Sequence, residues 1–211
     1  MQKLLNEWRT FITEAEAKFN YQDEVKKGDL SDLGVAFHLR TYGFKDKKYL
    51  IEAVHIVLGE SEGKFNATNK NRNGSTDYGI WQFNNFAHFK GDLGYKKRVA
   101  GIKRRFDGFR RKTKNKKVIE KLNRQQEKAI EKLTVSGRIP WISEEIARDP
   151  IRSTQHALIV FNDSKRRRGE SGRWTSWVRN ADTDLIKKYG LKKRKRAEAA
   201  VKKLFDEFPT S

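Results

Sequence analysis

One segment interrupts a chain that otherwise follows helical patterns. Residues 47–59 (KKYLIEAVHIVLG) are nearly all apolar, which predicts a buried helix. From residue 64 to residue 86 that pattern stops: Asn and Gly residues predict turns, and the aromatic run YGIWQF is typical of a short strand or hairpin edge. The fold is therefore expected to be α+β and mainly α, with a small β-hairpin region.

The rest of the sequence predicts further helices around this segment. The candidates are residues 2–20, 30–41, 96–135, 150–161 and 183–207, with a further helix-like piece, GRWTSWVRN, at 172–180. Pro150 suits the first turn of its helix. We expect a single domain over residues 1–211. Its parts are N-terminal helices 1–46, a core of about 47–95 and 140–182, a basic helical insertion of about 96–139, and a basic C-terminal helix of about 183–211.

The composition excludes several kinds of site. With no cysteine, the chain has no disulfide, no thiolate nucleophile and no cysteine-based zinc site. Its four histidines lie beside apolar residues and show no ligand spacing such as H-E-x-x-H. We therefore expect neither a metal nor another cofactor.

Positive charge is the strongest compositional bias. The chain has 47 Lys and Arg against 27 Asp and Glu, a net charge of +20. Sixteen of the basic residues lie between Lys96 and Lys132, with four acids among them, and two more basic clusters occupy 164–173 and 187–203. These clusters are either solvated helix faces or contacts to an anionic partner such as an acidic wall polymer, packaged DNA or lipid headgroups.

The N-terminal sequence MQKLLNEWRTFITEAEAKF lacks the apolar core of a signal peptide. No stretch approaches the roughly 18 apolar residues that a membrane span needs. We expect a protein made in the cytoplasm without a secretory signal and delivered to the cell wall or periplasm by another route.

Two acidic residues flank the loop-rich segment. Glu60 closes the apolar run of 47–59, where apolar neighbours and the negative end of the helix dipole both favour a protonated carboxyl group. Asp77, seventeen residues later, lies in a Gly-Ser-Thr-Asp-Tyr-Gly turn whose amides and hydroxyls favour the ionised form. Such a pair predicts acid-assisted cleavage of a glycosidic bond. Glu62 is a competing acid beyond the helix end, and Asp77 alone could simply be a turn residue.

The string from Glu60 to Asn84, with its seventeen-residue spacing between the acids, resembles the active-site segment of c-type lysozymes. Its E-S-x-G and N-x-N-G-S patterns also resemble specialised lytic transglycosylases of phages and secretion systems. Both groups belong to the lysozyme-like superfamily. A weaker match, SGRWTSWVRN, resembles the lysozyme helix whose tryptophan packs over the catalytic acid, here Trp177 with Trp174 one turn earlier. More than half of the chain carries no such resemblance.

The resemblance implies a lysozyme-like fold and a role for each matched residue. Glu60 becomes the general acid, and Asp77 the nucleophile or electrostatic stabiliser of the oxocarbenium-like state. Trp177 would form an apolar wall beside Glu60. The implied substrate contacts are Asn69, Asn71, Gln82, Asn84, Trp174 and Trp177, with Gln82 and Asn84 on alternate positions of one strand. The ordinary alternatives are turn formation for the amides and core packing for the tryptophans.

The function that this resemblance implies is cleavage of the β-1,4 bond between N-acetylmuramic acid and N-acetylglucosamine in peptidoglycan. The Glu–Asp pair favours a hydrolase, and the shared motifs leave open a lytic transglycosylase that forms 1,6-anhydromuramic ends. We expect a phage lysin associated with the virion, contacting peptidoglycan strands and other virion or secretion-apparatus proteins. A candidate of another class is a basic nucleic-acid-binding virion protein on a lysozyme-like scaffold.

Overall fold

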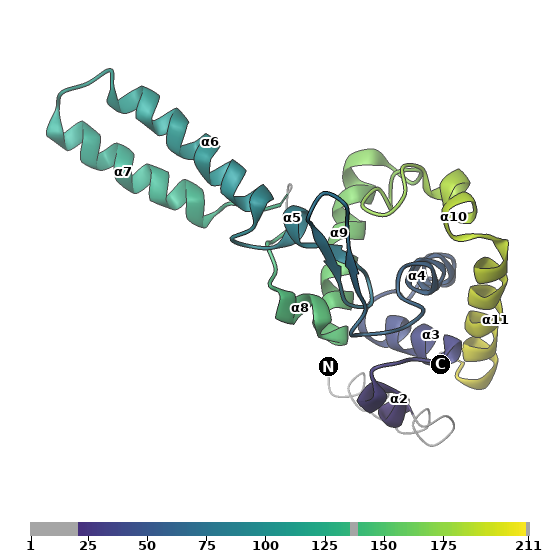
Figure 1. The fold of residues 1–211 in the computed structure, drawn as a ribbon. Coiled ribbons are helices and arrows are strands. Elements are labelled where there is room, and N and C mark those ends of the chain that lie inside the picture. Colours follow the sequence, from purple (N-terminus) through teal and green to yellow (C-terminus); the bar gives the residue numbers. More distant parts are fainter. Residues whose placement is uncertain (1–20, 136–138, 210–211) are drawn as a thin grey trace, which may run out of the picture.

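The computed structural model describes residues 21–135 and 139–209, so the helix expected at 2–20 lies outside the described residues. A helical body carries a small sheet on one side, and a two-helix hairpin projects from it (Figure 1). The helices are α2 (Tyr21–Lys27), α3 (Asp32–Tyr42), α4 (Lys47–Glu60), α5 (Asn85–His88), α6 (Leu93–Arg110), α7 (Lys116–Glu131), α8 (Glu144–Arg148), α9 (Pro150–Arg168), α10 (Ala181–Tyr189) and α11 (Leu191–Glu207). The mainly helical α+β prediction is confirmed, and no described helix is long and apolar enough to cross a membrane.

Helix α4 is the centre of the body. Asp46 caps its start by accepting a hydrogen bond from the Tyr49 backbone N–H at 3.1 Å. Most of its apolar residues, including Leu50, Val54 and Val57, are fully buried because α3, α10 and α11 pack around it. The apolar run predicted as a buried helix therefore forms the core, and it carries Glu60 at its last position.

The interruption after α4 folds into a three-stranded antiparallel sheet in the order β1-β2-β3. The strands are β1 (Thr68–Lys70), β2 (Thr76–Tyr78) and β3 (Phe83–Asn84). The chain between β2 and β3 comes close to α8. A Cβ on Gly79 would lie 1.8 Å from the Ala147 carbonyl oxygen, and Gly79 has a φ of +76°, so only glycine fits this approach.

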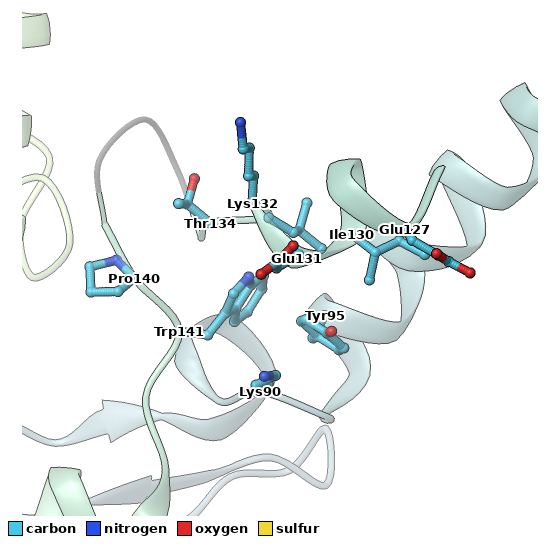
Figure 2. Close-up of a pocket in the computed structure, with 10 residues that line it drawn as sticks. Lys90, Tyr95, Glu127, Ile130, Glu131, Lys132, Thr134, Pro140 and Trp141 are labelled. Carbon is cyan, nitrogen blue, oxygen red and sulfur yellow. The ribbon is translucent and has the colours of Figure 1, made fainter. Parts of the chain in front are cut away.

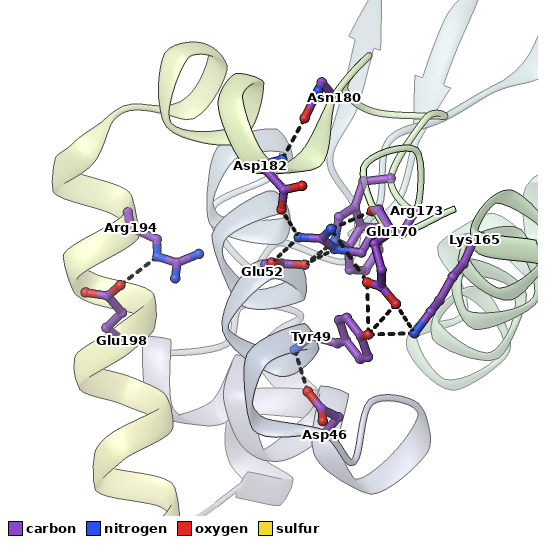
Figure 3. A network of polar contacts seen from close by, with 11 residues as sticks. Asp46, Tyr49, Glu52, Lys165, Glu170, Arg173, Asn180, Asp182, Arg194 and Glu198 are labelled. Atoms are coloured by element: carbon purple, nitrogen blue, oxygen red, sulfur yellow. Dashed lines mark hydrogen bonds and ion pairs between the residues drawn. The ribbon is translucent and has the colours of Figure 1, made fainter. Parts of the chain in front are cut away.

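Two predicted helices take a different form. The helix expected over 183–207 is two helices, because Gly190 at φ +86° ends α10 and starts a new direction for α11. The piece at 172–180 is a series of turns instead of a helix. A buried ion pair holds it: Arg173, with a side chain 1% exposed, donates to both Glu52 oxygens on α4 at 2.8 and 2.7 Å and to Asp182 at 2.7 Å (Figure 3).

The basic insertion forms a helical pair, as the apolar pattern of 96–135 predicts. Helices α6 and α7 run antiparallel and are joined by a short turn, where Asn115 caps α7 by accepting from Lys117 and Val118 N–H groups. Arg110 on α6 fastens the pair by donating to Asn123 and Gln126 of α7, both at 2.8 Å. The two helices project away from the body (Figure 1) and contribute no buried residue.

Candidate active site

Glu60 lies where the core helix meets the sheet. It ends α4, and the next residue, Ser61, caps the helix. The buried Ser61 hydroxyl donates to the Ile80 carbonyl at 2.8 Å. Because Ile80 follows β2 by two residues, this bond ties the end of α4 to the strand that carries Asp77.

The Glu60 carboxylate is held through one of its two oxygens. Oε1 accepts hydrogen bonds from Lys188 Nζ at 2.7 Å and from the Tyr189 hydroxyl. Lys188 also donates to the Trp177 carbonyl at 3.1 Å, which places the Trp177 backbone beside this group. Within the described part of the chain, Oε2 accepts no hydrogen bond, so it is the oxygen left for a substrate.

Tyr189 reaches Glu60 only because the residue before Glu60 is glycine. A Cβ on Gly59 would lie 2.1 Å from Tyr189 Cδ1, so a larger side chain would displace the ring. Burial raises the pKa of the Tyr189 hydroxyl, and the Glu60 charge and hydrogen bond raise it further. Tyr189 therefore stays a neutral donor to Glu60.

Asp77 on β2 is held by two amide side chains. Its Oδ2 accepts from Asn71 Nδ2 at 3.0 Å, and its Oδ1 accepts from Asn84 Nδ2 at 2.7 Å. Both amides also bond to the Ser75 hydroxyl, at 3.1 and 2.8 Å. Asn71 and Asn84 thus fix the orientation of the carboxylate, a role that the sequence comparison did not assign to them.

The strand register places three of the predicted site residues in one row. Asn69 on β1 and Asn84 on β3 are both directly opposite Asp77 on β2. Directly opposite residues of antiparallel strands project from the same face of a sheet. Asn69 is exposed, so its amide is accessible on the face that carries Asp77.

The placement predicted for Gln82 is wrong. β3 begins at Phe83, and Gln82 has a φ of +50°, so it belongs to the preceding turn and does not alternate with Asn84 along a strand. Its side-chain amide donates to the Gly79 carbonyl at 2.8 Å and to the Ala67 carbonyl at 3.2 Å. Gln82 braces the loop between β2 and β3.

The two tryptophans of the 172–180 segment differ in exposure. Trp174 is fully buried, packs on Phe161 and Trp81, and donates from Nε1 to Glu52 at 2.7 Å. In this structure it is a core residue and presents no face to a sugar, contrary to its predicted substrate contact. Trp177 is partly buried against Trp81, and its Nε1 donates to the Trp81 carbonyl at 3.1 Å.

Glu62, the competing acid, faces away from the sheet. It forms ion pairs with Lys193 at 2.7 Å and Arg196 at 3.0 Å, both on α11. Burial works to raise the pKa of Glu62, but hydrogen bonds from the two cations outweigh it and the pKa is lowered. An acid held ionised against α11 is unsuited to donate a proton.

Two histidines, the partly buried His88 and the buried His156, lie close to the Asp77 end of the site. His88 and His156 have ring centroids 5.8 Å apart, and both pack on Phe83. Burial lowers the pKa of His88 to about 4, against the opposing charge of Asp77. Burial and the neighbouring His88 lower the pKa of His156 to about 3. Both rings are therefore neutral at neutral pH.

Lys188 and Tyr189 are the site residues that the sequence did not reveal. They lie 128 and 129 positions after Glu60, in a stretch that looks like one more basic amphipathic helix. Gly190 is the sequence feature that could have indicated their position, because a glycine after a run of helical residues often ends a helix. That ending places both residues at the close of α10, opposite the end of α4.

Comparison with known proteins agrees with this geometry. Residues 38–103, which include Glu60, Asp77 and all three strands, match a family described as a lysozyme-like domain. The chain contains a lysozyme-like domain. A curated relative, lysozyme c-1 of Anopheles gambiae, is 44% identical over 71 residues, or 34% of this chain and 43% of that protein. The chain thus spans less than half the length of this relative. No solved structure matches the chain.

The matched region contains both acids, but the residues that bind the Glu60 carboxylate lie outside it. The lysozyme-like domain provides Glu60 on its helix and Asp77 on its sheet. Trp177, Lys188 and Tyr189, which surround Glu60, come from beyond residue 103. The C-terminal helices therefore complete the surroundings of the acid that the matched domain supplies.

Proposed function

We propose that this protein is a muramidase that cleaves the β-1,4 bond between N-acetylmuramic acid and N-acetylglucosamine of peptidoglycan. A lysozyme-like domain points to peptidoglycan degradation. The observation that carries the finer proposal is the pair of differently held carboxylates. Glu60 ends a buried helix with one oxygen unoccupied, and Asp77 is fixed through both of its oxygens on the adjoining sheet.

In this proposal Glu60 protonates the glycosidic oxygen as the bond breaks. A proton on Oε2 is compatible with the observed contacts, because Oε1 can keep both Lys188 and Tyr189 as donors. Asp77 stabilises the developing positive charge on the sugar or attacks it as the nucleophile. Water then completes the reaction, with Glu60 acting as the base.

Asn69 and Trp177 remain the proposed substrate contacts with accessible surface. Asn69 is exposed beside Asp77, and Trp177 is partly buried, with its backbone carbonyl bound to the Lys188 ammonium that also binds Glu60. An amide can hydrogen-bond N-acetyl and hydroxyl groups, and an indole edge can pack on a sugar ring. The amides of Asn71, Gln82 and Asn84 can take part only in addition to the bonds that they already make.

The alternative is a lytic transglycosylase, in which Glu60 suffices and the 6-hydroxyl of muramic acid closes an anhydro ring. The arrangement is compatible with hydrolysis, because Asp77 is held through both of its oxygens on the sheet face that also carries Asn69. Mass spectrometry of the products from purified peptidoglycan tests this. Reducing muramic ends are expected, and 1,6-anhydromuramic ends would overturn the hydrolase proposal.

A second candidate function is nucleic-acid binding through the basic helices, supported by the net charge of +20. It requires no catalytic acid. If the purified protein never releases soluble fragments from peptidoglycan but is retained on a DNA column with a steep salt dependence, the binding function replaces the enzymatic one.

The proposed setting is a phage or other mobile-element particle that delivers the enzyme to the cell wall and opens it locally. A strongly basic protein is compatible with storage beside a packaged polyanion. Mass spectrometry of purified particles tests this setting: the protein is expected in them, and its absence would contradict the virion location without affecting the proposed chemistry.

A further inference from the structure

The hairpin formed by α6, α7 and their connecting turn, residues 93–131, is here called the cationic arm. It holds fifteen Lys and Arg against four acids, a net charge of +11 in a chain whose total is +20. The arm therefore concentrates more than half of the net charge in less than a fifth of the chain. Such a concentration creates a local field that the rest of the surface does not balance.

Almost all of this charge is available to a partner. Fourteen of the fifteen basic residues are exposed, and the other, Arg110, is partly buried. Arg110 is used inside the arm, where it pairs with Asp107 at 2.5 Å and bonds to Asn123 and Gln126. That pair is the only ion pair of the arm among the described residues.

The cations follow a repeat along α6. Three basic triplets lie at 96–98, 103–105 and 110–112, seven residues apart. Seven residues make about two helical turns, or about 10.5 Å, so equivalent members of the first two triplets line up along α6, and the third triplet begins at the last residue of that helix. An extended polymer with repeated negative charges matches such rows better than a single small anion does.

Two of the four acids of the arm lie at its base. Glu127 and Glu131 line a pocket of about 610 Å³ together with Tyr95 and Trp141, where the arm joins the body (Figure 2). Farther out, residues 103–121 contain ten basic residues and two acids, a net charge of +8. The distal arm thus presents a nearly uniform positive surface.

The short helix α5 connects the arm to the sheet that carries Asp77. α5 follows β3 without a break, and the Asn85 side chain accepts from the Thr76 backbone N–H of β2 at 2.9 Å. α6 then packs so closely that a Cβ on Gly94 would lie 2.1 Å from the Phe86 carbonyl oxygen. A polymer bound along the arm would therefore extend to the edge of the candidate active site.

We propose that the cationic arm binds the carboxylates of peptidoglycan and holds the wall beside the site that cuts it. This rests on the proposed function, because peptidoglycan is then the polyanion that reaches the site. Its peptide stems carry free carboxylates spread through a network. Exposed Lys and Arg attract such groups over about a Debye length, and salt weakens the attraction.

The binding test uses a triple variant of the arm, Lys103→Gln, Arg104→Gln and Arg105→Gln. All three residues are exposed, and Gln keeps a high helix propensity, so α6 is preserved. The matched control is Arg168→Gln, Lys192→Gln and Lys195→Gln, which removes the same charge from exposed positions outside the arm. Both sets are placed in a Glu60→Gln background so that the wall is not digested.

Cosedimentation with purified insoluble peptidoglycan is measured at low and high salt. We expect the arm variant to bind about tenfold more weakly at low salt, and the control to differ from the parent by less than about twofold. Equal weakening by both variants would overturn the proposal, since the effect would then follow net charge alone.

Modified walls identify the chemical group. Amidation of the carboxylates should abolish the difference between parent and arm variant, whereas removal of attached phosphate polymers should preserve it. Loss of binding on walls stripped only of phosphate polymers would overturn the proposal. So would an arm variant that binds peptidoglycan normally but loses retention on DNA.

Activity with Glu60 intact separates this inference from the proposed function. The arm variant should cut glycan strands without peptide stems at the parental rate and intact peptidoglycan about tenfold more slowly at low salt. Equal loss on both substrates would contradict an anchoring role. If the unsubstituted protein cuts neither substrate while still binding the wall through the arm, the proposed chemistry fails and the binding surface stands.

Discussion

Lys188 Nζ lies 2.7 Å from Glu60 Oε1, and it also bonds to the Trp177 carbonyl and the Tyr189 hydroxyl. The candidate acid therefore has a cation at its side as well as the apolar neighbours that its sequence predicts. Lys188 and Tyr189 together hold the carboxylate through Oε1 and leave Oε2 for a substrate.

Replacing Lys188 with Met should lower the kcat of peptidoglycan cleavage several-fold, because it removes the donor that holds both Glu60 Oε1 and the Trp177 carbonyl. The measurement is kcat on purified peptidoglycan. Lys187→Met, at an exposed neighbouring position outside any ion pair in the described residues, serves as the control and should leave kcat unchanged. An unchanged kcat in Lys188→Met would show that this contact has no influence on the acid.

Replacing Tyr189 with Phe should lower kcat by about tenfold to a hundredfold and leave KM unchanged. The hydroxyl donates to Glu60 Oε1, and a hydrogen bond to a charged group contributes about 1.5–3 kcal/mol. Gly59→Ala should have a similar effect. Its Cβ would displace the Tyr189 ring, so the hydroxyl group is kept but moves away from Glu60. A rise in KM with unchanged kcat would instead assign Tyr189 to substrate binding.

Much of the fold follows from local sequence patterns. The apolar run ending at Glu60, the turn residues after it and Pro150 each act on neighbouring positions, so α4, the sheet and the start of α9 agree with their predictions. The helical pair of the basic insertion also agrees, because its apolar positions recur with the helical period.

The contacts that complete the site could not be predicted in this way. Lys188 meets Glu60 across 128 positions, and Arg173 meets Glu52 across 121, so each pairing depends on the assembled fold. Trp174 illustrates the same limit. A tryptophan can either pack against a sugar ring or belong to the core, and the sequence does not distinguish the two roles. The hydrogen bond from Trp174 to the buried Glu52 shows that it belongs to the core. The sequence does not predict the turn position of Gln82, because a left-handed backbone at a residue other than Gly leaves little trace in the sequence.

Stability should fall as the pH drops below about 6.5. Burial lowers the pKa of His38 to about 4, of His88 to about 4 and of His156 to about 3, from an unfolded value of 6.5. Between these values the unfolded chain binds protons that the folded chain does not, so acid favours unfolding. Each histidine contributes up to about 1.4 kcal/mol per pH unit. Urea unfolding between pH 7 and pH 4 measures the slope, and His156→Gln should make it shallower; an equal slope would contradict this cause.

Replacing Arg173 with Met should destabilise the protein by about 3–5 kcal/mol, because it leaves Glu52 buried without its cation. The control is Arg194→Met at the more exposed pair with Glu198 (Figure 3), where a loss of about 0–1 kcal/mol is expected. Both are measured by urea unfolding. Equal losses in the free energy of unfolding would contradict a larger contribution of the buried pair to stability.

The most direct test of the central claim is release of soluble glycan fragments from purified peptidoglycan by the unsubstituted protein and by Glu60→Gln. Gln keeps the size of the side chain and a carbonyl acceptor for Lys188 and Tyr189, but it cannot act as the acid. We predict release by the unsubstituted protein and at least a hundredfold loss, about 10²–10⁴, in a folded Glu60→Gln variant. Undiminished release by that variant would contradict the assignment of Glu60 as the catalytic acid.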